Sequence, residues 1–327
     1  MSFRISYFYI LLICFFCSFQ ACNKKDSLPW EYVIHDGYAW DYTSIYKIKN
    51  TGGGLLAVGG ERFNKGVILK YNALIGWELE SISTQRNKSF HGITENTTNQ
   101  EVIVVGMDGN IVKKSPIESQ WLHMNQPYWE AMNDIAYTPN NYWIVSGLAF
   151  HKGKLFNYDF EGNISIEDSF DHELNKINFD DYPKGIILGY GIVLETKNAG
   201  VEWEENYSIK GDHFIDYFKG ENKEFIIGSE GSIWERDANM DNWLKIRNGA
   251  KVLQKKLRMN AIFMLNDKEG FIACDEGILL YTKDGWKNKT AFRFPDLKGE
   301  NILSLGTDDT SKLWCATSSG TFIEIFL

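Results

Sequence analysis

The chain has 327 residues, is 44% hydrophobic and 15% aromatic, and carries a formal net charge of −9. An acidic chain without a stripe of lysines and arginines lacks the electrostatic footprint of a phosphate-backbone binder, so we expect no nucleic-acid partner. The 6 prolines beside 29 glycines favour many tight turns over disordered linkers. The aromatic content favours β-strands.

Residues 1–21 have the layout of an export signal. Arg4 precedes an uncharged apolar run from Tyr7 to Phe19, which is followed by the small residue Ala21. The run is too short for a spanning helix and has no stop-transfer flank. The letters FQAC, which end at Cys22, resemble the lipobox of bacterial lipoproteins, with Phe19 where leucine is usual. This resemblance implies cleavage before Cys22 and lipid attachment to that residue.

Lipidation at Cys22 would anchor the chain stably, because several acyl chains on one residue suffice where a single chain is marginal. We therefore expect a location in the cell envelope, periplasmic or surface-exposed, on a bacterial membrane. The alternative is an ordinary secretory signal that is cut near Ala21. In the first case residues 22–28 form a short polar tether, and residues 29–327 form the functional domain.

The next feature along the chain is a repeat of an apolar strand, a tight turn that closes on glycine, and a second apolar strand. Seven closing glycines follow one another at spacings of 38 to 46 residues: Gly66, Gly109, Gly153, Gly191, Gly231, Gly277 and Gly320. Seven copies at this period are typical of a β-propeller with four short strands per blade. Helical solenoids have similar periods, but these segments are too short and too β-branched for helices.

Each copy extends to four strands. An inner strand with a central Ile or Leu precedes the pair, and an outer strand follows it; four outer strands carry tryptophan, at Trp77, Trp121, Trp203 and Trp243. The seventh copy lacks an outer strand, whereas residues 29–34 form a strand-like run without an inner strand of its own. The prediction is an all-β, seven-bladed propeller of four-stranded antiparallel blades, closed by this N-terminal strand. The alternative is six blades and a separate hairpin.

Two cysteines, Cys274 and Cys315, lie in the strand patterns of neighbouring repeats. There they fit as small buried hydrophobes, so we expect free thiols. After residue 21 the sequence has no CxxC and no His/Cys cluster at metal-ligand spacing, so neither a metal nor a cofactor is predicted.

The segment Thr196 to Trp203 fits the pattern Ser/Thr-x-Asp/Asn-x-Gly-x-x-Trp, in which Asn198 caps the turn, Gly200 takes a positive φ and Trp203 anchors the outer strand. Weaker copies include Thr282 to Trp286. These residues resemble the BNR/Asp-box repeats of Ycf48-like and sialidase-like propellers, over residues 29–327. The Ycf48-like resemblance implies a non-enzymatic role in assembly or in holding a partner.

The candidate binding residues stand two positions before the Ile or Leu of the inner strands, where the chain enters each blade. They are His91, Asn133, Asn175, His213 and Asn260, with Thr43 and Glu300 near the same place in blades one and seven. A ring of polar side chains at this position could bind a ligand at the mouth of the channel. The alternative is that a hydrated rim simply tolerates polar residues.

The sequence thus predicts a monomeric binding or assembly scaffold without catalytic residues, which holds a protein or a glycan of the envelope. The alternative is a sialidase-like glycan hydrolase or a carbohydrate-binding protein. Sialidases use three arginines to bind the substrate carboxylate, and their Phe/Tyr-Arg-Ile-Pro motif is absent after residue 21. Arg236 begins a turn on the wrong side for a pocket at the channel mouth.

Overall fold

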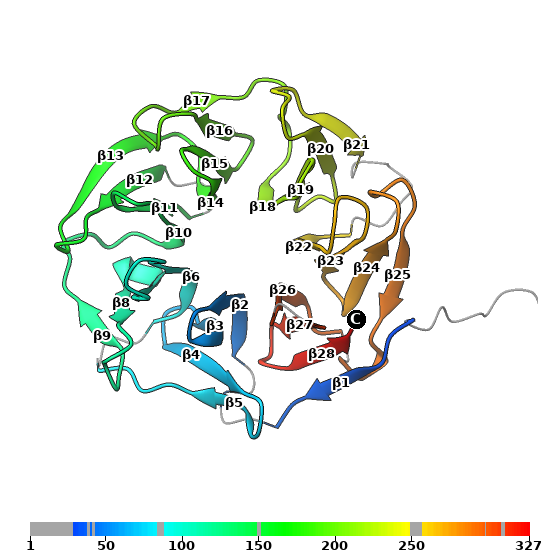
Figure 1. Ribbon diagram of the computed structural model, residues 1–327, viewed down its shortest axis with the longest axis horizontal. Coiled ribbons are helices and arrows are strands. Elements are labelled where there is room, and N and C mark those ends of the chain that lie inside the picture. Colours follow the sequence, from blue (N-terminus) through cyan, green and yellow to red (C-terminus); the bar gives the residue numbers. More distant parts are fainter. Residues whose placement is uncertain are drawn as a thin grey trace, which may run out of the picture.

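The computed structural model describes residues 29–37, 40, 43–83, 88–148, 152–248, 257–297, 299–308 and 311–327. These residues fold into seven four-stranded antiparallel sheets, arranged as blades in a ring (Figure 1). The predicted signal 1–21, Cys22 and the tether 22–28 lie outside the described residues. Within the described ranges, no helix is long and apolar enough to cross a membrane.

In each blade the first strand is innermost. Blade one comprises β2 (Ser44–Thr51), β3 (Gly54–Glu61), β4 (Lys65–Asn72) and β5 (Gly76–Leu79). Blade two comprises β6 (Phe90–Glu95), β7 (Val102–Gly106), β8 (Ile111–Lys114) and β9 (Leu122–Met124). Blade three comprises β10 (Met132–Tyr137), β11 (Tyr142–Ser146), β12 (Gly153–Tyr158) and β13 (Ile164–Phe170). Blade four comprises β14 (Leu174–Asp181), β15 (Lys184–Gly189), β16 (Val193–Thr196) and β17 (Glu204–Glu205).

The second half of the ring repeats this order. Blade five comprises β18 (Phe214–Lys219), β19 (Lys223–Gly228), β20 (Ile233–Asp237) and β21 (Leu244–Arg247). Blade six comprises β22 (Met259–Met264), β23 (Gly270–Cys274), β24 (Ile278–Thr282) and β25 (Thr290–Arg293). Blade seven comprises β26 (Ile302–Thr307), β27 (Lys312–Thr317), β28 (Phe322–Phe326) and β1 (Tyr32–His35). Two 3-10 turns, η1 (Met107–Gly109) and η2 (Pro295–Leu297), are the helical elements of the described part.

Blade seven is completed by the N-terminal strand, as predicted. β1 pairs antiparallel with β28, and Tyr32 lies opposite Ile325. The imidazole Nε2 of His35 lies 2.9 Å from a carboxylate oxygen of Glu324, so a side-chain contact adds to the backbone pairing. The ring therefore closes with seven blades, and the alternative of six blades and a separate hairpin is wrong.

The antiparallel order of the strands defines two faces of the ring. Connections into the inner strands and turns between second and third strands lie on one face, which we call the inlet face. Turns between first and second strands and between third and fourth strands lie on the other. β1 begins beside the end of β28 on this second face, where the preceding segment joins the propeller, and we call it the tether face.

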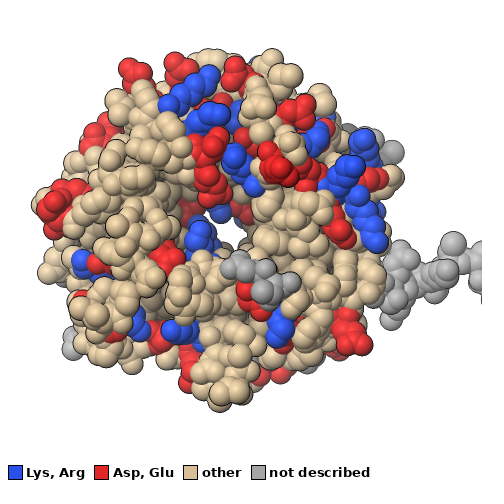
Figure 2. Space-filling model, in the orientation of Figure 1, with Lys and Arg blue, Asp and Glu red and all other residues tan. Residues whose placement is uncertain are grey.

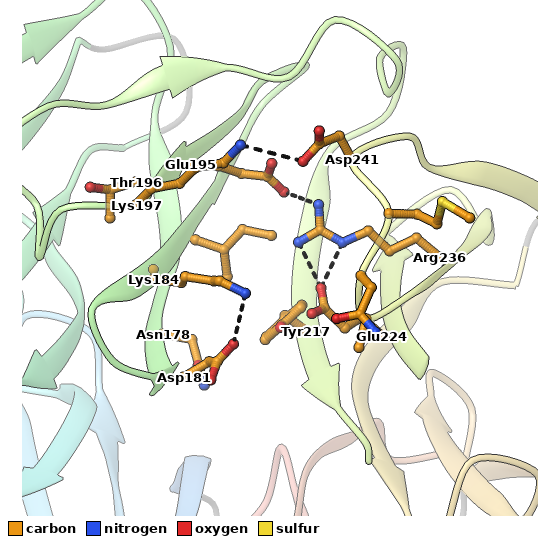
Figure 3. A pocket seen from close by; sticks show the side chains of 15 residues that line it. Asn178, Asp181, Lys184, Glu195, Thr196, Lys197, Tyr217, Glu224, Arg236 and Asp241 are labelled. Atoms are coloured by element: carbon orange, nitrogen blue, oxygen red, sulfur yellow. Dashed lines mark hydrogen bonds and ion pairs between the residues drawn. The ribbon is translucent and has the colours of Figure 1, made fainter. Parts of the chain in front are cut away.

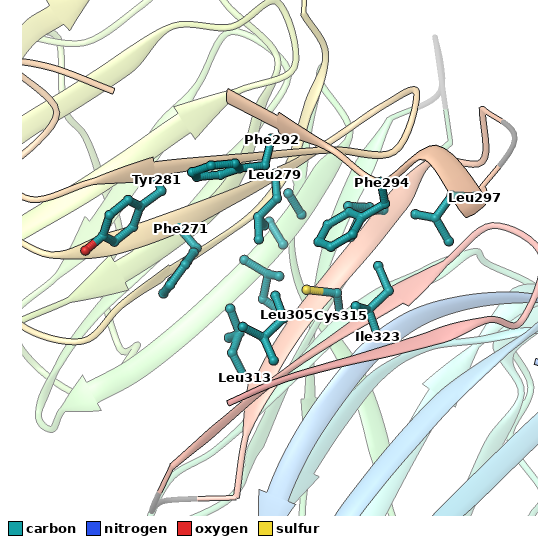
Figure 4. Packing of buried hydrophobic residues seen from close by; sticks show 14 residues of the cluster. Phe271, Leu279, Tyr281, Phe292, Phe294, Leu297, Leu305, Leu313, Cys315 and Ile323 are labelled. Atoms are coloured by element: carbon teal, nitrogen blue, oxygen red, sulfur yellow. The ribbon is translucent and has the colours of Figure 1, made fainter. Parts of the chain in front are cut away.

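The hydrophobic core lies between the blades. The second strands β7, β11 and β23 are buried along their whole length, because each sheet packs against a neighbour on both sides. Figure 4 shows the cluster between blades six and seven, where Cys315 packs among Leu279, Phe294 and Ile323. Cys274 and Cys315 are both buried, free thiols, and burial raises the pKa of each.

The turn from Thr196 to Trp203 joins the third and fourth strands of blade four. Asn198 Oδ1 accepts the backbone N–H of Glu202 at 3.0 Å, and Thr196 Oγ1 accepts that of Gly200 at 3.1 Å. Gly200 has φ +88°, and a Cβ there would lie 2.6 Å from the ring of Trp143. Only glycine meets both requirements. The side chain of Asn198 therefore caps the turn, as the sequence predicts.

Two details of the predicted outer strands are wrong. In blade six, Trp286 takes the place of Gly200 and not of the closing tryptophan, because Thr282 Oγ1 accepts its backbone N–H at 3.0 Å. Trp121, Trp203 and Trp243 stand one residue before their strands. A bulky residue at the end of the turn packs under the strand that follows, so the tryptophan marks the turn and not the strand.

Candidate functional site

The centre of the ring contains a cavity of about 690 Å³, lined by the inner strands of all seven blades. Its lining includes all five candidate residues: His91, Asn133, Asn175, His213 and Asn260. Figure 2 looks along this channel and shows basic and acidic side chains beside the central opening. The structure thus places the five predicted residues in one cavity.

A β-bulge recurs at the same position in every inner strand, and it explains the ring. In β10, for example, the pairing with β11 skips from Met132 to Asp134 and leaves Asn133 unpaired. A bulged residue leaves the ladder, so its side chain is free to turn towards the channel. The skipped residues of the seven blades are Tyr46, His91, Asn133, Asn175, Ile215, Asn260 and Leu303.

The three asparagines of this ring tie each blade to the next. Asn133 Nδ2 donates to the carbonyl oxygens of Gly147 and Leu174, both at 2.8 Å. Asn175 Nδ2 donates to the carbonyl of Phe214 at 3.1 Å, and Asn260 Nδ2 donates to that of Ile302 at 2.9 Å. Gly147 belongs to the same blade as Asn133, whereas Leu174, Phe214 and Ile302 are the residues before the bulge of the following blade. The amide N–H groups therefore serve the ring itself.

His91 occupies the same ring position in blade two. Its Nε2 lies 3.0 Å from the hydroxyl of Ser89, and its ring packs edge-on against Tyr46 at 4.9 Å between centroids. Burial lowers the pKa of His91 to about 4, and the positive charge of Arg62 acts in the same direction. His91 is therefore a neutral imidazole near pH 7.

His213 does not occupy the ring position, so the prediction for blade five, which counted two residues back from Ile215, is wrong. The predicted count started from Ile215, but Ile215 is the bulged residue, and the buried residue equivalent to Ile177 is Tyr217. Thr43 and Glu300 are also displaced from the ring position, which Tyr46 and Leu303 occupy, because Ile45 and Ile302 precede the bulge of their strands. A one-sequence count cannot detect a bulge residue that is itself an isoleucine.

His213 still lines the cavity, at its inlet end. Its Nε2 lies 2.7 Å from a carboxylate oxygen of Glu173, and its ring lies 5.5 Å from that of Tyr190. Both partners come from blade four, so His213 links two blades through its side chain. It is a neighbour of the ring and not a member of it.

The wall of the channel carries two ion pairs that the sequence analysis missed. Lys47 pairs with Asp134, and Lys176 Nζ lies 2.7 Å from Asp216 Oδ1. All four residues directly follow the bulge in their strands. Charged residues beside the central Ile of a buried strand are the signal that could have identified them.

The two lysines titrate in opposite directions. Burial lowers the pKa of Lys47 to about 8 against the pull of Asp134, and the nearby charge of Lys176 lowers it further. Burial also acts to lower the pKa of Lys176, but the carboxylates of Asp216 and Asp134 outweigh it and hold that pKa above its ordinary value. The same carboxylates also serve the backbone: Asp134 accepts the N–H of Ile177, and Asp216 accepts that of Ile262.

Two arginines line the cavity at its inlet end. Arg62 comes from the turn between β3 and β4, and Arg258 directly precedes β22; both are exposed. Three large aromatic side chains are exposed in the connections of the same face: Phe63 (56%), Trp129 (68%) and Tyr190 (54%). The guanidinium of Arg62 lies 5.1 Å from the ring centre of Phe63.

A second pocket of about 300 Å³ lies on the tether face, between blades four and five (Figure 3). Arg236 spans it, with Nη1 2.5 Å from Glu195 and Nη2 2.7 Å from Glu224. Arg236 is therefore far from the channel mouth, as predicted, but it does line a pocket, which the sequence analysis did not expect. Both of its carboxylate partners are in place, so the arginine joins the two blades.

The other described arginines do not converge on the channel. Arg247 donates to the carbonyl of Gly231, and Arg293 pairs with Glu276. Among the described arginines, Arg62 and Arg258 alone line the central cavity. No group of three His, Cys, Asp or Glu side chains suited to a metal ion occurs within the described residues.

The fold and its channel define the molecule as a seven-bladed β-propeller. No protein-family model matches the chain, and no curated protein matches it. Among solved structures it is similar to YCF48 from Cyanidioschyzon merolae, with a TM-score of 0.68 and 12% identity over 90% of this chain and 98% of that chain.

YCF48 bound to D1 peptide gives a TM-score of 0.67 at 12% identity, over 92% of this chain and 96% of that chain. The WD40 β-propeller domain of Doa1 gives 0.64 at 9% identity, over 90% and 97%. Identities this low show a shared fold and nothing finer.

Proposed function

We propose that this chain is a non-enzymatic binding scaffold of the cell envelope, held at a bacterial membrane by lipid on Cys22. Its inlet face binds a protein partner at the mouth of the channel. The observation that carries this proposal is the pair of exposed arginines at that mouth, Arg62 and Arg258, together with Phe63 beside Arg62 and the exposed aromatic side chains in other connections of the same face. Arginine and exposed aromatic residues are enriched where proteins bind one another.

The charge at the channel mouth supports an acidic segment as the bound part of the partner. In the wall, Lys47 and Lys176 are matched by Asp134 and Asp216. The two arginines at the rim add positive charge above this neutral wall, in a chain whose net charge is −9. A guanidinium binds a carboxylate through two parallel hydrogen bonds, so an extended segment with acidic side chains fits this rim.

The ring of asparagines has little part in this role, because its N–H donors already bind the next blade. Binding by residues on irregular loops above a rigid ring is the usual arrangement of a scaffold. The similarity to a propeller solved with a bound peptide supports a peptide as the ligand class. The Asp-box-like turns, which resemble BNR repeats, are then folding devices on the other face.

A sialidase-like hydrolase is the second candidate, favoured by the same arginines. That chemistry needs three arginines around one carboxylate, whereas two line this cavity in the described part of the chain. Purified full chain should release no product from a fluorogenic sialoside. Turnover that disappears in Arg62→Ala would contradict the scaffold proposal.

Photo-crosslinking in native envelopes tests the binding role directly. A photoreactive amino acid replaces Phe63 or Tyr190 on the inlet face, and Val201 on the tether face in a parallel strain. We expect a discrete crosslinked protein from the two inlet positions, and a yield at least about tenfold lower when Arg62→Ala and Arg258→Ala are combined. Arg293→Ala, an exposed arginine outside the cavity, is the matched control and should retain the yield.

The anchor is tested separately. Metabolic labelling with an alkyne fatty acid should label the full chain, and Cys22→Ala should abolish the label. Label that persists in Cys22→Ala would refute lipidation at this residue. Crosslinking that is lost equally in Arg293→Ala and in the double variant would refute the specific role of Arg62 and Arg258 at the channel mouth.

A further inference from the structure

The turns between third and fourth strands carry a recurring feature that neither the ring nor the partner site uses. In blades one to five each of these turns exposes a large apolar side chain: Leu74 and Ile75, Ile117, Phe160, Val201 and Met240. Leu74 is 93% exposed, Ile117 is 95% exposed and Val201 is 79% exposed. We call these six side chains the apolar tips.

All apolar tips lie on the tether face, because third-to-fourth turns share one edge of every blade. The inlet face differs: within the described residues, its exposed large apolar side chains are aromatic, and none is aliphatic. Single exposed apolar residues need no explanation, but exposed apolar residues in the same turn of five consecutive blades form an arc around one face.

The folding of these turns does not require the tips. In blade three, Asp159 accepts the backbone N–H of Asn163 at 2.7 Å, and in blade four Asn198 caps its turn. Acidic side chains beside the tips are also engaged: Asp241 lies 3.5 Å from Lys197, and Asp181 lies 3.4 Å from Lys184. The apolar groups are therefore left facing outward, and Asp241 and Asp181 on the same face are paired with lysines.

The chain outside the described residues indicates what covers this face. β1 is fixed to β28 with its start on the tether face, and only residues 23–28 separate Cys22 from Pro29. The seven steps from Cys22 to Pro29 span at most about 25 Å. A lipid attached at Cys22 would hold the tether face, and not the inlet face, towards the bilayer.

We propose that the tether face rests on the lipid surface, with the apolar tips inserted at the level of the headgroups. This inference depends on the proposed lipid anchor and extends it from a flexible attachment to a defined orientation. Aliphatic and aromatic side chains at the boundary of headgroups and acyl chains gain free energy by leaving water. In blade six the corresponding turn exposes Lys283 and Lys287, which suit anionic headgroups.

The consequence is an orientation for the partner site. The channel axis would be perpendicular to the membrane plane. The inlet face, with Arg62 and Arg258, would point away from the bilayer. A partner that approaches from the aqueous side would then meet the proposed site directly.

The test uses the full lipidated chain in vesicles of phosphatidylethanolamine and phosphatidylglycerol at 3:1. An environment-sensitive fluorophore is attached at Ile117→Cys on the tether face or at Phe63→Cys on the inlet face as the matched control. The native thiols Cys274 and Cys315 are buried. We expect nitroxide lipids to quench the label at position 117 at least about threefold more than the label at position 63.

A second variant separates insertion from anchoring. Leu74→Ser, Val201→Ser and Met240→Ser together should reduce the quenching at position 117 while the chain still floats with the vesicles. Equal quenching at positions 117 and 63 in floating chain would overturn the orientation and leave the anchor intact. Failure to float would overturn the anchor, and crosslinking at Phe63 reports the partner site independently of both.

A label at position 117 that is shielded without sensitivity to nitroxide lipid would also overturn the proposal, because it would assign the tips to a protein contact. Unchanged thermal unfolding of the triple variant shows that the tips act outside the fold.

Discussion

The two faces of the propeller use the same repeat for opposite chemistry. On the inlet side, the ring position carries asparagine in three blades, and each of these asparagines donates to the following blade, as Asn133 does to Leu174. On the tether face, the recurring turn position carries apolar residues such as Ile117, which are almost fully exposed. The recurring asparagines thus hold the blades together, whereas the recurring apolar residues of the surface remain available for contact with another surface.

This difference changes where function should be sought. At the channel mouth the repeated residues are engaged, so binding depends on residues that occur in single blades, such as Arg62 and Arg258. At the tether face no single turn is distinctive, and the repeated position itself provides the contact surface. One face is therefore suited to a specific partner, and the other to an extended, uniform surface.

The largest loss of stability is expected on substitution of Trp40, which lies on the inlet face where blades seven and one meet. Trp40 is 3% exposed, packs in the cluster between blades seven and one, and donates from Nε1 to the carbonyl of Gly320 at 3.3 Å. Trp40→Ala should lower the free energy of unfolding by about 3–5 kcal/mol, because it opens a cavity and leaves that carbonyl without its donor. Urea unfolding followed by tryptophan fluorescence measures the change.

Trp203→Ala is the counterpart on the tether face. Trp203 is half-buried, and its Nε1 has no hydrogen-bond acceptor within the described structure. Its loss should cost clearly less than the loss of Trp40. Equal costs would show that the tryptophans of the two faces contribute alike to stability.

The next effect is a pH dependence of the free energy of unfolding, which arises from Lys47 in the channel wall. Lys47 has a pKa of about 8 when folded, against 10.5 for the ordinary side chain. Between these values the unfolded chain binds one more proton than the folded chain, so this group adds stability as pH rises from 8 to 10.5, by about 3 kcal/mol. The contribution is lost again as pH falls through 8.

Urea unfolding of wild type and Lys47→Met at several pH values between 7 and 10 measures this slope. The difference in the free energy of unfolding between the two chains should widen in favour of wild type as pH rises. Lys197→Met, an exposed lysine of the tether face, should follow the wild-type curve. Parallel curves for all three chains would show that Lys47 does not titrate in this range.

The sequence contained nearly all of the fold, because the repeat is visible as strand pairs that end in glycine. Gly231 and Gly320 have positive φ, a conformation that favours glycine. A glycine in the sequence therefore marks these turns. Closure by residues 29–34 could be predicted because blade seven lacked its fourth strand. The bulge of blade five could not be predicted, since Ile215 looks like the buried isoleucine that other blades have two residues after the bulge.

The candidate site was less visible. Asn133, Asn175 and Asn260 could be found by counting from the central Ile, but the pairing of Lys47 with Asp134 joins residues 87 positions apart. The charged residues beside the central Ile are visible in the sequence, but their pairing arises from the closed ring and leaves no local signal. The apolar tips were present in the sequence, but their shared face follows from strand direction, which a letter pattern does not give.

The smallest effect compares two asparagines with the same side chain on opposite faces. Asn133→Ala removes donors to Gly147 and Leu174 and so weakens the contact between blades three and four, at a cost of about 2 kcal/mol. Asn198→Ala removes one acceptor inside a single turn and should cost about 1 kcal/mol. Equilibrium unfolding resolves the two values, and amide exchange locates them: Asn133→Ala should increase exchange in both blades, whereas Asn198→Ala should affect its own turn. If Asn133→Ala instead left stability unchanged and reduced capture of the partner as strongly as the arginine variants, the ring would be a binding surface and the contrast between the two faces would be wrong.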